Sequence, residues 1–81
     1  SLGQIELEKR GRGAAALAAF ERYLARHPDG ALALEALHGR TRCLMRLGRP
    51  AKERDALEEF LRRFPNAIQA SAARRRLAEI E

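Results

Sequence analysis

The chain has 81 residues, including 14 arginines, 2 lysines and 11 acidic residues, and a formal net charge of +5. This length suits one small domain, which buries only about 60–65% of the surface that its unfolded chain exposes. The single cysteine, Cys43, excludes an internal disulfide, and no run approaches the roughly 18–20 apolar residues that a membrane-spanning helix needs.

Residues that favour helices dominate the chain and valine is absent, so we expect an all-α protein without strands. In chain order we expect about five helices, separated by breaks that contain glycine or proline: residues 2–10, 13–26, 31–47, 50–64 and 67–80. The connections between them are short, so consecutive helices should lie antiparallel as neighbours.

Glycine and proline residues mark the expected helix ends. Gly11 and Gly48 can adopt the left-handed conformation that closes a helix C-terminus, and Pro50 suits the first turn of the next helix. Pro28 and Pro65 disfavour helical geometry at the residues before them. The aspartate or asparagine that follows each of these prolines is expected to cap the next helix.

The pattern of breaks occurs twice. Gly48 and Pro65 follow Gly11 and Pro28 at the same offset of 37 residues, and an aromatic-Leu-x-Arg sequence precedes each proline in the same place. This recurrence indicates a duplicated helical unit. Small and large apolar residues alternate on the expected helices, which suits the close packing of stacked helical hairpins.

The order of small, aromatic, glycine and proline residues resembles the tetratricopeptide repeat, a helix-turn-helix unit of about 34 residues. Counting back from Pro28, Phe20 falls at the aromatic position of that family, Ala16 at its small position and Gly11 at its inter-helix glycine. The second unit departs from the pattern, because Glu53 replaces the small residue and the unit is three residues longer.

The resemblance implies a right-handed solenoid of stacked antiparallel hairpins. The chain would then be one domain, residues 1–81, and a fragment of a longer protein. It would comprise the second part of a truncated repeat, one full repeat and a capping helix, at residues 1–28, 29–65 and 66–81. The truncated repeat would leave an uncovered apolar edge at Leu2, Ile5 and Leu7, and we expect this edge to drive self-association into a homo-oligomer.

The stretches that begin at Pro28 and Pro65 are most similar to the long-repeat variety found in bacterial cell-envelope proteins. These include lipoproteins of outer-membrane protein assembly and periplasmic coordinators linked to the Tol system. The similarity favours a periplasmic or cell-envelope location, and it leaves a cytoplasmic location open.

The sequence contains no known catalytic motif: no phosphate-binding glycine loop, no His-Glu-x-x-His, no Gly-x-Ser-x-Gly and no cysteine pair. We expect Cys43 to be a small core residue and His27 to interact with a helix dipole. Arg40 stands where the family prefers an apolar residue, so it should reach the surface or pair with a carboxylate. We therefore expect no enzymatic activity, no cofactor and no metal ion.

The resemblance also implies that the first helix of each hairpin lines a concave groove. On this chain the groove residues would be Glu35, His38, Arg42, Met45, Arg75 and Glu79. Arg42 and Arg75 would bind a peptide carboxylate or an acidic side chain through paired hydrogen bonds, and Met45 would pack against an apolar side chain. An ordinary hydrated helix face is the alternative interpretation of the same residues.

The function implied by the resemblance is a protein-interaction scaffold that binds a peptide or a partner protein in this groove. Two alternatives stay open. A structural, self-associating segment of a larger envelope protein would lose its association when a charge replaces Leu7. A nucleic-acid-binding adaptor would bind short duplexes with an affinity that falls steeply with salt. We do not expect nucleic acid as the partner, because the arginines are spread along every segment. The three successive arginines at residues 74–76 would lie on different faces of a helix and could not form one patch.

Overall fold

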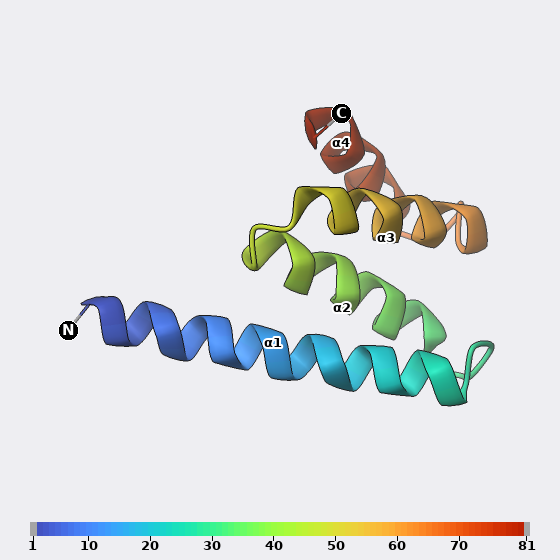
Figure 1. Cartoon of the computed structure of the whole chain (residues 1–81). Helices are drawn as coiled ribbons and strands as arrows, with labels where there is room; N and C mark the ends of the chain where they lie inside the picture. Colours follow the sequence, from blue (N-terminus) through green and yellow to red (C-terminus); the bar gives the residue numbers. More distant parts are fainter. Residues whose placement is uncertain (1, 81) are drawn as a thin grey trace.

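The computed structural model describes the backbone of residues 2–80 and the side chains of residues 11–80. Its helices are α1 (Leu2–Arg26), α2 (Ala33–Arg46), α3 (Pro50–Arg63) and α4 (Ala70–Ile80). Figure 1 shows them stacked in chain order, each packed against the next. The described residues form no strand, so the expected all-α class is confirmed. No helix in the described part of the chain is both long and apolar enough to cross a membrane.

The first two expected helices form one continuous helix, which corrects the predicted break at Gly11 and the predicted count of five helices. Gly11 and Gly13 both lie inside α1, and neither has a positive φ. Glycine costs a helix about 1 kcal/mol relative to alanine, but it keeps its N–H. Proline removes the N–H and clashes with the preceding turn. The second repeat has Pro50 where the first has Gly13, and only the second repeat breaks there.

The predicted end of α2 at Gly48 is confirmed. Gly48 has a φ of 67°, the left-handed conformation that glycine adopts without steric cost. The amides of Gly48 and Arg49 donate to the carbonyls of Met45 and Leu44 at 3.1 Å each, which is the Schellman arrangement of a helix C-terminus. Pro50 then occupies the first turn of α3, as predicted.

The predicted cap of α2 by Asp29 is wrong. The helix begins at Ala33, later than predicted, and its cap residue is Leu32, without a side-chain cap. The Leu32 amide donates instead to the hydroxyl of Tyr23 at 2.9 Å. Asp29 accepts a hydrogen bond from Arg63 at 3.0 Å, which ties the first inter-helix connection to the end of α3.

The duplication seen in the sequence is also present in the structure. Helix α3 covers residues 50–63, which are the residues 37 positions after 13–26 of α1. In the first connection the amides of Gly30 and Ala33 each donate to the carbonyl three residues earlier, and Ala67 and Ala70 do the same in the second. The two units therefore share both helix positions and turn geometry.

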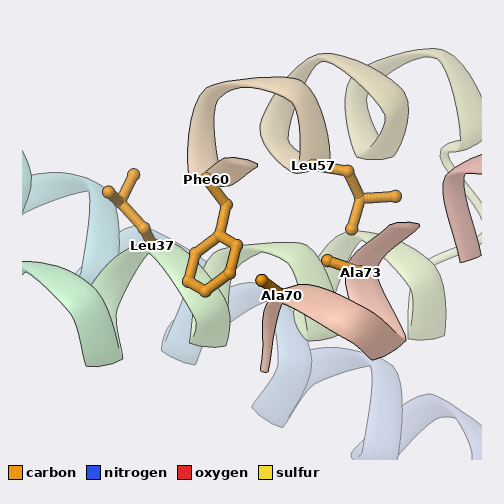
Figure 2. Packing of buried hydrophobic residues seen from close by; sticks show 5 residues of the cluster. All are labelled: Leu37, Leu57, Phe60, Ala70 and Ala73. Carbon is orange, nitrogen blue, oxygen red and sulfur yellow. The ribbon is translucent and has the colours of Figure 1, made fainter. Parts of the chain in front are cut away.

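Two clusters of buried apolar side chains hold the stack together. One joins the last three helices through Leu37, Leu57, Phe60, Ala70 and Ala73. Figure 2 shows the Phe60 ring lying between Leu37 of α2 and Ala70 of α4. The other cluster joins the first three helices through Leu17, Cys43, Leu44 and Ala56, which confirms the core position predicted for Cys43.

The predicted self-association edge lies outside the described side chains. Leu2, Ile5 and Leu7 belong to the N-terminal part of α1, of which the structure describes the backbone alone. Self-association through this edge therefore stays a prediction.

Candidate functional site

A pocket of about 240 Å³ lies between α2 and α4, with α3 at its base. We call it the α2–α4 pocket, and its lining residues are His38, Thr41, Arg42, Met45, Glu53, Leu57, Ala72, Ala73 and Arg76. Glu53 and Leu57 belong to α3 and are only 2% and 3% exposed, so they form the floor. Met45 is 42% exposed and leaves an apolar surface at the rim.

The pocket brings together part of the predicted groove. Three of the six predicted residues line it: His38, Arg42 and Met45. Glu35 is exposed on α2 and does not line the pocket, and neither does the exposed Arg75 of α4. The next residue, Arg76, lines the pocket in place of Arg75. Glu79 lies beside the pocket, where its Oε2 accepts a hydrogen bond from Nη1 of Arg76 at 3.2 Å.

Arg76 and Glu53 form a two-bond ion pair that the sequence analysis did not find. Nε of Arg76 donates to Oε2 of Glu53 at 2.6 Å, and Nη2 donates to Oε1 at 3.0 Å. A carboxylate as buried as that of Glu53 needs a charged partner, because an unpaired ion in a protein interior costs several kcal/mol, roughly 3–5 when one partner of a pair is removed. The signal in the sequence was Glu53 itself, which stands at the small position of the repeat.

The first repeat fills the corresponding space without charge. The equivalents of Glu53, Leu57 and Arg76, found 37 positions earlier, are Ala16, Phe20 and Gly39. A Cβ atom added to Gly39 would clash with the Phe20 ring, so the ring occupies the space over the glycine. In the second repeat the shorter Leu57 leaves this space to the ion pair.

The ionisable groups of the pocket differ in how far they are already paired. Hydrogen bonding by Glu53, assisted by Glu79, raises the pKa of Arg76 against the opposing effect of burial, so this guanidinium stays charged. Arg42 is exposed and forms no ion pair or side-chain hydrogen bond among the described residues. Arg42 is therefore the cation that remains available to a ligand.

His38 contributes an uncharged wall. Burial lowers the pKa of His38, and the charge of Arg42 lowers it further, so the imidazole is neutral at pH 7. Its ring packs against Phe60 at 5.8 Å between centroids, with a tilt of 50°. Together with Leu57 and the two alanines of α4, His38 makes the inner surface of the pocket predominantly apolar.

Other candidate groups of the sequence lie away from this pocket. Arg40 pairs with Glu59 at 3.1 Å, which confirms the expected pairing with a carboxylate. Burial raises the pKa of the Cys43 thiol above its ordinary value, and nearby arginines oppose this only partly. No group of three or more metal-binding side chains occurs among the residues that the structure describes.

Helices that recur at a fixed offset and stack each on the next along the chain are typical of a helical-repeat protein. Residues 35–67, from α2 to the connection before α4, match the family model of the tetratricopeptide repeat. Over these residues the chain is similar to the tetratricopeptide repeat, whose repeats generally mediate protein–protein interactions. Comparisons with curated proteins and with solved structures gave no match. The cell-envelope variety of the family stays a prediction.

Proposed function

We propose that this chain is a protein-interaction module that binds a peptide segment of a partner protein in the α2–α4 pocket. An apolar side chain of the peptide would enter the pocket over Leu57 and Met45. A neighbouring carboxylate, either a side chain or a chain terminus, would bind Arg42. The observation that carries the proposal is an exposed arginine, Arg42, which forms no ion pair with the residues the structure describes and lies at the rim of an apolar pocket.

The size of the pocket supports a peptide side chain as the occupant. Small-molecule and cofactor sites usually have about 300–1,000 Å³, whereas this pocket has about 240 Å³. A carboxylate on a guanidinium forms charge-assisted hydrogen bonds, which are about twice as strong as neutral ones. A ligand with one apolar side chain and one carboxylate therefore uses both features of the pocket.

We also propose that the chain acts by binding alone, without catalysis. The support comes from Cys43, its only thiol. This thiol is 8% exposed and lies in the apolar core, where burial raises its pKa and disfavours the nucleophilic thiolate.

A small probe tests the site directly. N-acetyl-leucine carries one apolar side chain and one carboxylate, and N-acetyl-leucine amide keeps the side chain and lacks the charge. At roughly 0.3 kcal/mol for each of about 12 non-hydrogen atoms, the acid gains about 4 kcal/mol, which is a dissociation constant on the order of 1 mM. Amide NMR spectra of the isotope-labelled chain measure affinities in this range.

We expect the acid to shift the amide signals of the pocket residues, and the amide to shift them less. Arg42→Gln should remove the preference for the acid. Arg46→Gln is the matched control, because Arg46 is an exposed arginine of the same helix that does not line the pocket. The proposal is rejected if the acid shifts no pocket signal, or if Arg42→Gln and Arg46→Gln behave alike.

A further inference from the structure

Arg76 is bound from two sides by carboxylates of different helices. Its Nε and Nη2 atoms face Glu53 of α3, at 2.6 and 3.0 Å. The remaining nitrogen, Nη1, faces Glu79 of α4 at 3.2 Å. All three nitrogens of the guanidinium thus have a carboxylate partner inside the chain.

The two carboxylates differ sharply in exposure. The side chain of Glu53 is 2% exposed, whereas that of Glu79 is 65% exposed. Removing the partner of a buried charge is strongly unfavourable, because the charge cannot recover its hydration. An exposed ion pair contributes little, because water and salt replace it readily. Glu79 is therefore the partner of Arg76 that an incoming ligand can displace.

Glu79 also balances the charge of the site. Arg42 and Arg76 carry two positive charges, Glu53 and Glu79 carry two negative charges, and the neutral His38 adds none. With Glu79 in place the site has no net charge, although it contains two guanidinium groups. Without the charge of Glu79 the same site would carry a net positive charge and would attract anions.

We propose that Glu79 is an internal competitor for the ligand: its carboxylate occupies the place on Nη1 of Arg76 where a carboxylate of an acidic peptide would bind. This inference rests on the proposed function, since it concerns the same pocket and the same class of ligand. Glu79 sets the selectivity of the pocket, because a ligand carboxylate must bind Arg76 better than Glu79 does in order to displace it.

The test is Glu79→Gln, which keeps the shape of the side chain and removes its charge. We expect the affinity for N-acetyl-leucine to rise by roughly two- to fivefold at low salt, the range of an exposed ion pair. The affinity for N-acetyl-leucine amide should stay unchanged, and the gain for the acid should shrink as salt is added. The matched control is Glu58→Gln, an equal charge change at an exposed residue of α3 that does not line the pocket.

Each outcome decides between the two proposals. A gain specific to the acid and to Glu79→Gln, over measurable binding by the original chain, supports the competitor. Binding of the acid by Glu79→Gln alone rejects peptide binding by the original chain and supports Glu79 as the group that blocks Arg76. Equal binding of the acid by the original chain and by Glu79→Gln overturns the role of Glu79 and leaves the proposed function in place. An equal gain in Glu58→Gln also overturns it, because net charge alone would then explain the effect. Absence of binding in every variant overturns both proposals.

Discussion

Replacing Arg76 by glycine should destabilise the chain far more than an ordinary surface substitution. The substitution leaves the Glu53 carboxylate, 2% exposed, without its two hydrogen bonds at 2.6 and 3.0 Å. An uncompensated buried charge of this kind costs about 3–5 kcal/mol. A domain of this length has a total stability of only about 4–12 kcal/mol. Arg76→Gly should therefore lose a large part of the free energy of unfolding of the chain.

The first repeat provides the compensating substitutions. Adding Glu53→Ala and Leu57→Phe to Arg76→Gly gives the second repeat the alanine, phenylalanine and glycine that the first repeat has at the equivalent positions. The triple variant has no buried charge at this place, and the new ring can lie over the new glycine. We expect it to recover stability to within about 2 kcal/mol of the original chain, because glycine in a helix still costs about 1 kcal/mol.

Urea unfolding followed by circular dichroism measures both variants on the same scale. We expect the changes in the free energy of unfolding to be strongly non-additive, since the residues concerned are in contact. Glu53→Ala alone should cost less than Arg76→Gly alone, because Arg76 keeps its bond to Glu79 and its access to water. A triple variant as unstable as Arg76→Gly would show that alanine, phenylalanine and glycine cannot replace the glutamate, leucine and arginine of the second repeat.

Three further predictions concern two glycines and one histidine. Gly39→Ala should cost about 1–3 kcal/mol in urea unfolding, because its Cβ would clash with the Phe20 ring. Gly11→Ala should instead stabilise α1 by about 0.4–1 kcal/mol, because a Cβ there meets no atom within 4 Å; a loss in both variants would contradict the argument. Because burial and Arg42 lower the pKa of His38, the unfolded chain binds a proton more readily than the native one. The free energy of unfolding should therefore fall as the pH falls below about 6.5 and towards the lower native pKa. His38→Gln should flatten this part of the pH profile, and an unchanged profile would show that other groups cause it.

The helix ends that proline determines were predictable from the sequence, and those that depend on tertiary contacts were not. Pro50 excludes a continuous helix on steric grounds, so the break before it follows from the sequence alone. Gly11 only permits a break, and nothing in the local sequence requires one. Asp29 had the right chemistry for a cap, but the helix begins later, at Ala33, and Asp29 accepts a long-range hydrogen bond from Arg63 instead. That bond depends on how α3 packs, which the local pattern does not contain.

The groove residues implied by the resemblance coincide only in part with the residues that line the pocket. On α2 the resemblance implied Glu35, His38, Arg42 and Met45, and all but Glu35 line the pocket. On α4 it selected Arg75, whereas Arg76 lines the pocket. Successive helical residues point about 100° apart, so an error of one position moves a side chain to another face. The buried carboxylate at Glu53 could have fixed the phase, because it needs an arginine that points towards α3.

The two repeats differ at a position that packs one helix on the next. Leu37 of α2 is fully buried in the cluster that includes Leu57 and Phe60 of α3. Its equivalent in α4, 37 positions later, is the exposed Arg74, which donates to the carbonyl of Pro65 at 2.7 Å. A position that packs α2 on α3 is thus polar and exposed in α4. The assignment of α4 as a capping helix stays a prediction. Helix α4 thus carries arginines at two positions where α2 carries leucine and glycine. One of these arginines, Arg76, forms the ion pair that lines the pocket.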